Sequence, residues 1–524
     1  MPRPRARREV RHRSRNGVSR QQGSEQRNGD GSHACSLAPG PPRPGVDSSP
    51  EETPVSAAPS LSEPHSDVAS IPARVERLRS AFDAGRTRPL EWRREQLQGI
   101  RALVRENVDV LEAALKADLG KPNLEGFLAD LGAVKAETDG ALKNLKRWTR
   151  PQRVASPMNV RPARSRIVRE PLGVALIIAP WNYPVQLLLS PLVGAVAAGN
   201  AVMLKPSEVS AHTSAELARL APRYLDPEAI DLVEGGVDET SALLAERFDH
   251  IFYTGNGRVA QVVMQAAAKH LTPVTLELGG KSPCLVDADV DMETTARRIA
   301  WGKFLNAGQT CVAPDYVLVH RSREDELVEA LSRAVEGFYG ADPKQSADYA
   351  RIINRKHHAR LAGLLKDADV AFGGKLDEEQ CYISPTVLRN VAPDAPAMDD
   401  EIFGPILPVL PVDDMDEAIA FVNRREKPLA LYIFTKDEEH EEAVVRGTSS
   451  GGVCVNGILW HLANPELPFG GVGPSGTGAY HGRASFETFS HRKSVLTKGW
   501  RFDAKPMYPP YGRIKTRLIK KLLG

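Results

Sequence analysis

The order of apolar and polar residues along the chain predicts two kinds of structural unit. Between residues 71 and 150, apolar side chains recur among charged neighbours, as at Leu97, Ile100, Leu103 and Val104. A recurrence every three to four residues places such side chains on one face of a helix. This part of the chain is therefore predicted to be helical.

Beyond residue 151, short apolar runs alternate with amphipathic stretches. The runs cover residues 174–179, 201–204, 230–233, 250–253 and 274–276. This alternation is typical of parallel strands joined by helical crossovers, so we expect a doubly wound α/β sheet. The pattern resumes over residues 283–286, 316–320 and 406–410, which predicts a second doubly wound α/β domain with a boundary near Gly279 and Gly280.

The first 72 residues differ from the rest in composition. Residues 1–20 hold eight Arg against one Glu, and residues 39–64 are rich in Pro and Ser. Such segments cannot bury a core, so we predict a disordered basic tail. An Arg-rich start is also typical of a transit peptide or a nucleic-acid arm, but Pro2 and Pro4 argue against the former. A solvated extension is the interpretation we favour.

Composition changes the picture little. Among 524 residues, 68 Lys and Arg face 66 Asp and Glu, so the net charge of +2 gives no indication of a nucleic-acid partner. The five cysteines have irregular spacing that fits neither a disulfide framework nor a zinc site, which predicts reduced thiols in a cytoplasmic protein. No apolar run approaches the length that spans a bilayer, so we expect a soluble protein.

A glycine-rich loop follows the apolar run at residues 250–253. Gly255, Asn256 and Gly257 begin a G-x-G-x-x-A pattern that leads into a helical stretch. Such a turn lets the backbone approach a dinucleotide diphosphate, although a plain strand-to-helix turn has the same letters. Spacing alone makes Glu277, twenty positions further on, the ribose-binding acid of a dinucleotide fold.

A second glycine pattern, over residues 471–476, matches G-x-G-x-x-G by letters. Pro474 lies inside it, and proline cannot continue a helix interior. We therefore interpret this stretch as a structural loop.

One cysteine stands in a polar loop. Cys311 ends the sequence Asn306-Ala307-Gly308-Gln309-Thr310-Cys311, between a helical stretch and a strand-like run. Buried cysteines usually act as small apolar residues, and we assign that role to Cys284, Cys381 and Cys454. By residue type alone the same role would be expected for Cys311.

Five motifs in order carry a resemblance to a known family. They are Pro180-Trp181-Asn182-Tyr183-Pro184, Leu204-Lys205-Pro206-Ser207-Glu208, Leu276-Glu277-Leu278-Gly279-Gly280-Lys281-Ser282-Pro283, Gly308-Gln309-Thr310-Cys311 and Glu401-Ile402-Phe403-Gly404-Pro405. Through them the chain resembles the aldehyde dehydrogenase superfamily over nearly everything after the tail. Its end, from Leu467-Pro468-Phe469-Gly470-Gly471 onward, is similar to the class 3 branch, which is associated with fatty and aromatic aldehydes.

The resemblance implies a catalytic set. Cys311 would be the nucleophile that adds to the aldehyde carbon, and Asn182 would stabilise the negative oxygen together with the Cys311 backbone N–H. Loss of hydride to a nicotinamide would give a thioester, and Glu277 would activate the water that hydrolyses it. The flanking Leu-Gly-Gly-Lys letters are more specific than a spacing of twenty, so we prefer this role of Glu277 to ribose binding.

The resemblance also implies a cofactor site. Lys205 and Glu208 would hold one ribose, Glu401 the ribose beside the nicotinamide, and Phe403 would pack near the ring. Glu208 favours the free 2′-hydroxyl of NAD, while the neighbouring lysine leaves NADP open. In one departure from the class 3 pattern, Gly257 stands where a threonine hydroxyl is usual. Taken singly, these residues also fit a strand exit, a helix cap and a core aromatic.

Substrate and assembly follow in the same way. Tyr183 and Phe469 match positions that line the substrate tunnel. Residues 165–168 and 494–497 resemble the bridging strands that pair across a dimer, so we expect a homodimer. Residues 511–524 interleave basic and apolar residues, which is typical of a helix that touches anionic lipid weakly, or of one packed on the protein's own surface.

Together these features divide the chain into four parts. They are a tail over 1–72, an NAD-binding domain over 73–279 with a bridging segment near 150–170, a catalytic domain over 280–480, and a bridging strand with a basic end over 481–524. Three other functions are weighed. A dehydrogenase that passes the acyl group to coenzyme A is disfavoured by Glu277, and a non-catalytic binding protein is disfavoured by Cys311, Glu277 and Asn182. The third is nucleic-acid binding by the basic tail as the main role, which deletion of residues 1–72 would test.

Overall fold

The computed structural model describes residues 66–501, 503 and 505–523. The predicted helical region is confirmed, since it contains η1 (Val68–Ser70), α1 (Ile71–Asp83), α2 (Leu90–Glu106), α3 (Val108–Leu119), α4 (Asn123–Gly126), η2 (Phe127–Leu131) and α5 (Gly132–Thr149). The boundary of the predicted tail at residue 72 is wrong, because η1 and the start of α1 precede it. The rest of that prediction, over residues 1–65, lies outside the described residues.

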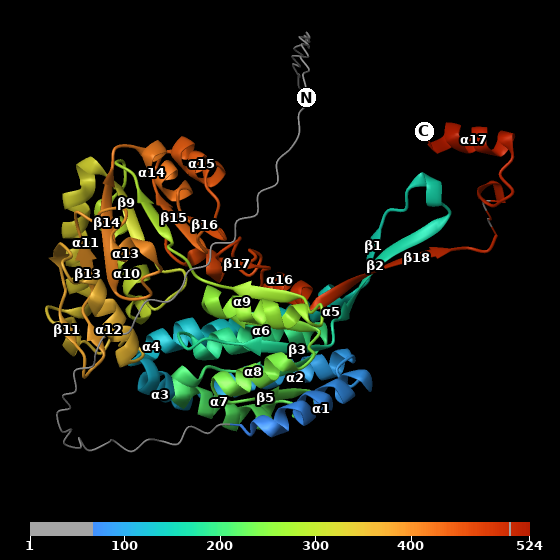
Figure 1. The fold of residues 1–524 in the computed structure, drawn as a ribbon, viewed down its shortest axis with the longest axis horizontal. Helices are drawn as coiled ribbons and strands as arrows, with labels where there is room; N and C mark the ends of the chain where they lie inside the picture. The colour runs from blue at the N-terminus through green and yellow to red at the C-terminus, as the bar shows by residue number, and fades with distance from the viewer. Residues whose placement is uncertain (1–65, 502, 504, 524) are drawn as a thin grey trace, which may run out of the picture. The chain divides into compact units, whose positions relative to one another are not determined.

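The first large sheet has six strands in the order β17-β7-β6-β3-β4-β5. These strands are β3 (Val174–Ile178), β4 (Ala201–Lys205), β5 (Ile230–Leu232), β6 (His250–Thr254), β7 (Val274–Glu277) and β17 (Gly476–Thr477). All neighbours are parallel except β17 and β7. The connecting helices are α6 (Pro184–Ala198), η4 (Glu208–Ser210), α7 (Ala211–Tyr224), α8 (Val237–Ala245) and α9 (Gly257–Ala268) (Figure 1).

The second large sheet has seven strands in the order β10-β13-β14-β9-β8-β15-β16. They are β8 (Pro283–Val286), β9 (Tyr316–His320), β10 (Val370–Phe372), β13 (Thr386–Leu388), β14 (Ile406–Val412), β15 (Ala430–Phe434) and β16 (Gly452–Val455), parallel except for β10. Its helices are α10 (Met292–Phe304), α11 (Glu324–Tyr339), α12 (Arg355–Leu364), α13 (Pro396–Asp399), α14 (Met415–Asn423) and α15 (Glu438–Gly447). Two doubly wound α/β sheets are thus present, as predicted.

The remaining elements are short or lie toward the chain's end. The short 3-10 helices are η3 (Met158–Val160), η5 (Leu305–Gly308), η6 (Arg321–Arg323), η7 (Pro343–Gln345), η8 (Trp460–Ala463) and η9 (Lys505–Met507). The others are β1 (Gln152–Val154), β2 (Ala163–Pro171), β11 (Leu376–Asp377), β12 (Tyr382–Ile383), α16 (Gly482–Thr488), β18 (Ser490–Lys498) and α17 (Arg513–Leu523).

The third sheet joins the two predicted bridging strands. Its order is β1-β2-β18, and all neighbours are antiparallel. Within one chain β2 and β18 pair with each other, so that Ser494 lies opposite Ile167. The two segments are therefore strands, as predicted, but their partner in this structure is the same chain.

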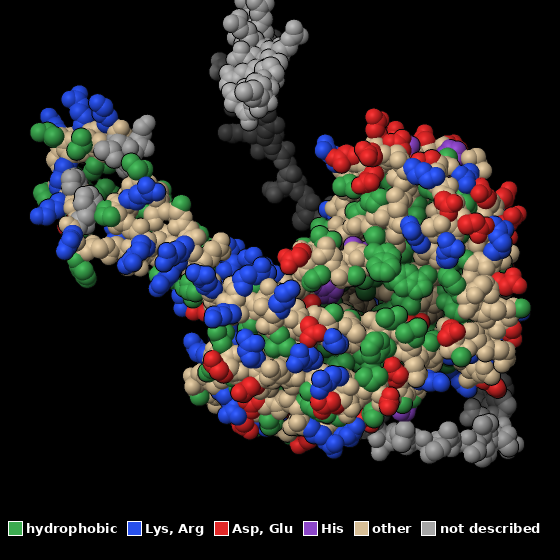
Figure 2. All heavy atoms as spheres, turned by 180° about the vertical axis from the view of Figure 1, so that it is seen from behind, with side chains coloured by type: hydrophobic (Ala, Val, Ile, Leu, Met, Phe, Trp, Pro, Cys, Tyr) green, Lys and Arg blue, Asp and Glu red, His purple; other side chains and the backbone are tan. Residues whose placement is uncertain are grey.

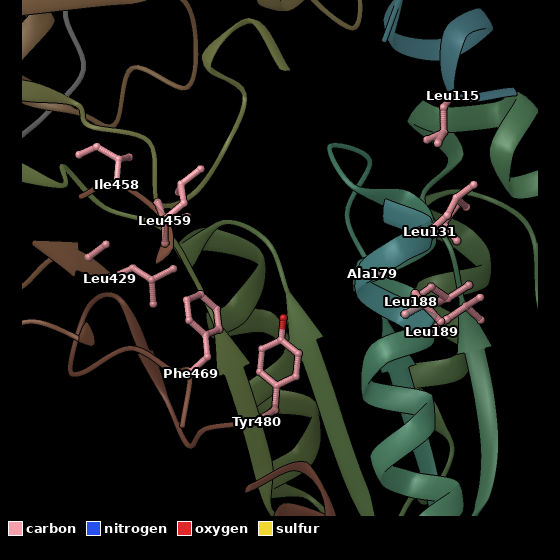
Figure 3. Close-up of a cluster of buried hydrophobic side chains, with 14 of the residues drawn as sticks. Leu115, Leu131, Ala179, Leu188, Leu189, Leu429, Ile458, Leu459, Phe469 and Tyr480 are labelled. Carbon is pink, nitrogen blue, oxygen red and sulfur yellow. The ribbon is translucent and has the colours of Figure 1, made fainter. Parts of the chain in front are cut away.

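The core is built around a nearly all-apolar helix. α6 begins with Pro184, ends at the left-handed Gly199, and packs against α2, α5 and α16. Strands β3, β4 and β6 are buried along their whole length, as parallel strands covered on both faces must be. Figure 3 shows Leu188 and Leu189 of α6 among the buried side chains. Within the described part of the chain, no helix is long and apolar enough to cross a membrane.

Candidate active site

The sequence-predicted residues gather where parallel strands end. Asn182 follows the end of β3, Lys205 ends β4, Gly255 follows β6, and Glu277 ends β7. These strands are parallel neighbours, so their carboxyl ends lie at one edge of the first sheet. In open α/β sheets this edge is where ligands bind, because the loops there come from different strands and can surround a molecule.

The loop before Cys311 has an unusual backbone. Asn306 and Ala307 have φ angles of 52° and 50°, and Gly308 follows at 73°, so three successive residues adopt the left-handed conformation. For residues with a Cβ atom this conformation is strained, and it persists only where surrounding contacts hold it. The turn ends α10 and carries the chain to the thiol, which the alternation of apolar and polar residues did not reveal.

Cys311 itself is partly exposed, and protein groups surround its sulfur. Burial raises the pKa of this thiol well above its usual range, and the nearby carboxyl groups of Glu401 and Glu277 raise it further. The free protein therefore holds Cys311 as a neutral thiol. Since the charges of Glu401 and Glu277 act on the Cys311 thiol, the thiol and both carboxyl groups lie in one site.

Asn182 and Tyr183 face the residues just before Cys311. The Asn182 side-chain amide donates to the carbonyl oxygen of Gln309 at 3.1 Å. The hydroxyl groups of Tyr183 and Thr310 lie 2.6 Å apart and share a hydrogen bond. The predicted amide donor is thus attached to the loop that carries the predicted nucleophile, although the two residues are far apart in sequence.

Glu277 lies buried at the end of β7. It is 2% exposed, and neither carboxyl oxygen has a hydrogen-bond partner among the described residues. Burial raises the pKa of Glu277 well above its usual range. Burial without partners disfavours the charged carboxylate, and perturbed groups of this kind are typical of functional sites.

The second glycine pattern pairs with the backbone around Glu277. Gly476 lies opposite Glu277 in the antiparallel pair of β17 and β7, and the Leu278 N–H donates to the carbonyl oxygen of Ser475. The short strand β17, and not a helix, follows this turn directly, so the interpretation as a structural loop agrees with the structure. Its glycines allow close backbone contact, because a Cβ atom at Gly476 would meet the Leu276 carbonyl oxygen at 2.4 Å.

Glu401 belongs to a cluster of buried charges. Lys281 donates to Asp315 at 2.7 Å, and Asp315 accepts the Ile402 N–H at 3.2 Å. Burial and the neighbouring Asp315 raise the pKa of Glu401 to about 8, against the lowering effects of the Gly280 N–H, Lys281 and Lys303. A Cβ atom at Gly279 would lie 2.1 Å from a Glu401 oxygen, so the absence of a side chain at Gly279 permits this contact.

The predicted cofactor residues on the first sheet fit an anionic nucleotide. Gly255 and Asn256 form the turn after β6, and the Asn256 side chain caps α9 by accepting the Val259 N–H at 3.0 Å. A Cβ atom at Gly257 would meet nothing within 4 Å, and the first turn of α9 contains no acidic residue. The strand, turn and helix around the G-x-G pattern are therefore as predicted, with space and free N–H groups for a phosphate.

Lys205 and Glu208 lie beyond β4. The Lys205 ammonium group is buried, donates to the Pro206 carbonyl oxygen at 2.7 Å, and is 3.7 Å from the partly exposed Glu208 carboxylate. Burial lowers the pKa of Lys205, while Glu208 acts in the opposite direction. The two side chains together offer a donor and an acceptor, which suits a ribose with two hydroxyl groups.

Aromatic side chains border the site. Phe403 adopts a left-handed φ of 50°, and its ring meets Trp181 edge to face with centroids 5.4 Å apart. The Phe469 ring packs on Tyr480 with centroids 5.6 Å apart (Figure 3). It also stacks on the His481 ring at 5.2 Å. The two predicted substrate residues, Tyr183 and Phe469, are both buried.

Some residues near the site were not among the site residues predicted from the sequence. Tyr480 is fully buried within electrostatic reach of Glu277 and Cys311, and Tyr432 donates to the Val312 carbonyl oxygen at 2.6 Å. A single aromatic residue shows no pattern that separates a site position from a core position, so only the fold could place Tyr480 and Tyr432 here. The described residues contain no group of His, Cys, Asp and Glu that could hold a metal ion.

Two doubly wound sheets with a thiol, an amide and a carboxyl group gathered beside a nucleotide-type loop are typical of an α/β oxidoreductase. The sequence profile of the Aldehyde dehydrogenase family matches residues 46–495. The chain belongs to this family, which makes it an aldehyde-oxidising enzyme. The resemblance noted from the five motifs is thereby confirmed.

Individual relatives agree with this assignment. The rat protein "Aldehyde dehydrogenase, dimeric NADP-preferring" is 51% identical over 445 residues, which cover 84% of this chain and 98% of the relative. The mouse protein "Aldehyde dehydrogenase family 3 member B2" is 48% identical over 472 residues, 90% of this chain and 98% of the relative. These relatives support the predicted class 3 branch.

Solved structures show the same architecture. AldH of Staphylococcus aureus, in a substrate-bound state, has a TM-score of 0.85 and 44% identity and covers 87% of this chain and 99% of its own. The indole-3-acetaldehyde dehydrogenase AldA of P. syringae, solved with NAD+, has a TM-score of 0.77 and 27% identity and covers 83% of this chain and 90% of its own.

Proposed function

We propose that this enzyme oxidises an aldehyde to a carboxylic acid through a covalent cysteine intermediate that water then hydrolyses. The observation that carries the proposal is the meeting of Cys311, Asn182 and Glu277, from three distant parts of the chain, at one edge of the first sheet. Each supplies a different function that acyl chemistry requires: a nucleophile, a donor to a negative oxygen, and a base.

The residues act in sequence on the carbonyl group. The Cys311 thiol gives up its proton to solvent, and its sulfur forms a bond to the aldehyde carbon. The carbonyl oxygen, which gains negative charge, accepts hydrogen bonds from the Asn182 amide and the Cys311 N–H. A bound nicotinamide dinucleotide, held by Lys205, Glu208, the Gly255-Asn256-Gly257 turn, Glu401 and Phe403, would supply positive charge and a hydride acceptor. After oxidation the acyl group is a thioester on Cys311.

Glu277 then removes a proton from water, whose oxygen attacks the thioester carbon. The carbon–sulfur bond breaks, the acid leaves, and the Cys311 sulfur takes up the proton that Glu277 removed from the water. Glu277 has no other hydrogen-bond partner among the described residues, so its oxygens are available to a water molecule. Water rather than coenzyme A is therefore the acceptor we propose.

We propose NAD as a cofactor, with NADP used as well. Glu208 favours the unmodified ribose of NAD, whereas the neighbouring Lys205 offers a charge to a phosphate. Among the relatives, the rat enzyme is named NADP-preferring and the P. syringae structure contains NAD+. Following the absorbance of reduced cofactor with each dinucleotide, using hexanal, decanal and benzaldehyde, measures both preferences.

For assembly we propose a homodimer in a reducing, cytoplasm-like compartment. The rat relative is named dimeric, and β18 leaves a free edge in the three-stranded sheet. The four cysteines among the described residues are all free thiols. Light scattering that gave the mass of one chain would contradict the dimer.

The mechanism makes a sharp kinetic prediction. Cys311→Ala abolishes turnover, whereas Glu277→Gln leaves a rapid burst of reduced cofactor and slows the steady state by about 100-fold or more, the usual scale for loss of a general base. Stopped-flow absorbance separates the two phases. Cys381→Ala serves as the control, because this partly exposed thiol lies outside the site and its loss leaves both phases unchanged.

Equal slowing of burst and steady state in Glu277→Gln would remove Glu277 from the hydrolysis step. Turnover that required added coenzyme A would favour the acylating alternative. Cofactor binding without any burst in the wild-type enzyme would favour a binding protein.

A further inference from the structure

Two charged side chains lie directly behind the candidate site without belonging to it. Lys121 stands just before α4 and Glu125 lies within it, one helical turn further on. Lys121 is 1% exposed, and protein groups surround the Glu125 carboxyl group. A charged group is held in such a place only when partners satisfy it, so the partners indicate what the pair does.

Lys121 holds the backbone of Asn182. Its ammonium group donates to the Asn182 carbonyl oxygen at 3.0 Å and to Asp130 at 2.8 Å, and it lies 4.1 Å from the centre of the Tyr183 ring. Asp130 in turn accepts the Val185 N–H at 3.2 Å, in the first turn of α6. The segment that carries the amide donor is therefore fixed from behind.

Glu125 holds the other half of the site. Its carboxyl oxygen accepts the Asn306 N–H at 2.7 Å, across 181 positions of sequence. Asn306 and Ala307 are the two non-glycine residues with left-handed backbone just before Cys311. The Asn306 side chain donates to the Asn182 carbonyl oxygen at 2.9 Å, which links this turn to the segment held by Lys121.

We propose that Glu125 is a positioning residue, whose hydrogen bond to Asn306 holds the left-handed turn that aims the Cys311 thiol at the carbonyl carbon. Lys121, from the same segment, keeps Asn182 in register with that turn. This proposal rests on the proposed function, because the orientation of the thiol matters only if Cys311 is the nucleophile. The conformation of the turn can be measured without any substrate, so the role of Glu125 and the proposed function can be contradicted separately.

The ionisation of Glu125 provides a second test of the hydrogen bond to Asn306, because it makes the strength of that bond depend on pH. Burial raises the pKa of Glu125 to about 7, while Lys121 and the Asn306 N–H lower it and Asp130 raises it. The other titratable groups that face it are the hydroxyls of Tyr183, Tyr339 and Tyr349. A carboxylate accepts a hydrogen bond more strongly than a carboxylic acid does, so the turn is held more firmly as the pH rises through about 7.

The test compares Glu125→Leu, which removes the acceptor, with Glu125→Gln, which keeps an acceptor without the charge. The matched control is Asp249→Leu, because the Asp249 carboxylate also accepts a backbone N–H, that of Val174 at 2.8 Å, but at the opposite end of β3. Hydrogen exchange measured by mass spectrometry follows residues 305–311, and stopped-flow absorbance follows the burst of reduced cofactor.

We expect Glu125→Leu to speed exchange in residues 305–311 by about tenfold or more and to slow the burst by a similar factor, with cofactor affinity unchanged, since loss of one such bond costs about a factor of ten. Glu125→Gln should keep the slow exchange and most of the burst while losing the change in exchange near pH 7. Asp249→Leu should lower the melting temperature and leave exchange in residues 305–311 and the burst as in the wild type.

A rescue tests the reason for the effect. Ala307→Gly relieves the left-handed strain without removing any hydrogen bond, so in the Glu125→Leu background it should restore part of the burst rate. Unchanged exchange in Glu125→Leu, an equal loss in Asp249→Leu, or no rescue by Ala307→Gly would each overturn the proposal. If Glu125→Leu did not fold, a Glu125→Gln enzyme with the pH response of the wild type would overturn it. A wild-type enzyme without a burst would contradict the proposed function alone, because the exchange comparison would stand.

Discussion

Three groups that can each carry a negative charge crowd the site at the residue scale. The carboxyl groups of Glu277 and Glu401 both raise the pKa of the Cys311 thiol, and burial raises the pKa of all three. Like charges in a buried site cannot all be ionised at once, so ionisation of one group suppresses the others. Positive charge beside the thiol would therefore favour its reactive thiolate form.

The raised pKa of Glu401 should make the free energy of unfolding depend on pH. Its folded-state pKa of about 8 lies above the ordinary value of 4.5, so between these values the folded protein holds a proton that the unfolded chain has lost. The free energy of unfolding then falls as the pH rises through this window, by at most about 1.4 kcal/mol per pH unit. Glu401→Gln cannot ionise and escapes this loss.

Urea unfolding at several pH values between about 5 and about 8 measures the effect. We expect the difference in unfolding free energy, variant minus wild type, to shift in favour of Glu401→Gln as the pH rises. The exposed Glu439→Gln is the control and should show no such trend. A difference that stayed constant with pH would show that Glu401 is not protonated in the folded protein.

At the scale of elements, the turn between β6 and α9 departs from the usual class 3 pattern. Gly257 is the first residue of α9, and its position is open enough to accept a side chain. A helix N-terminus with free N–H groups already attracts an anion, and a hydroxyl there would add one more donor to a diphosphate. We therefore expect the departure to weaken cofactor binding without closing the site.

Gly257→Thr should restore that donor. We expect the Kd for the dinucleotide to fall about fivefold, which corresponds to about 1 kcal/mol for one added hydrogen bond. Gly257→Ala is the matched control, since both substitutions remove a helical glycine but only threonine adds a hydroxyl group. Quenching of protein fluorescence by the dinucleotide measures Kd, and equal affinities in the two variants would contradict the role of the hydroxyl.

At the scale of the whole molecule, the three-stranded sheet and α17 carry a basic surface. Exposed residues of the three-stranded sheet include Arg164, Arg166, Arg492 and Lys493. α17 adds five more cations and no acidic residue, beside an Ile514 side chain that is 88% exposed. Figure 2 shows Lys and Arg side chains gathered along this part of the chain. We propose that α17 makes weak peripheral contact with anionic lipid, which its mixed charge and apolar surface fit.

This contact should be weak and sensitive to salt. Each cation near an anionic surface contributes about 1 kcal/mol at low ionic strength, and salt screens that attraction. Sedimentation with phosphatidylserine vesicles should carry down the wild type, and the double variant Lys515→Glu with Lys520→Glu should stay in solution with its activity intact. Equal binding to uncharged phosphatidylcholine vesicles would contradict an electrostatic contact.

The sequence determined the class of fold and pointed to the candidate reacting groups. Alternating apolar runs specify buried parallel strands because the pattern of burial repeats with local geometry, and β3, β4 and β6 lie where the runs indicated. The letters around Cys311 and Glu277 located both residues for the same reason, since a motif is a property of neighbours in the chain. The tail boundary was misplaced because composition changes gradually there, while η1 begins sharply at Val68, directly after its N-cap residue Asp67.

Only the tertiary structure decided what surrounds those groups. The bond from Asn306 to Glu125, the pairing of Gly476 with Glu277, and the pairing of β2 with β18 all join residues that are remote in sequence. The protonation of the site also depends on which groups exclude water and which charges lie nearby in space. A pattern along the chain records which residues are neighbours in sequence, and so it reveals strands and motifs. Burial and local charge depend on residues that meet only in the packed molecule.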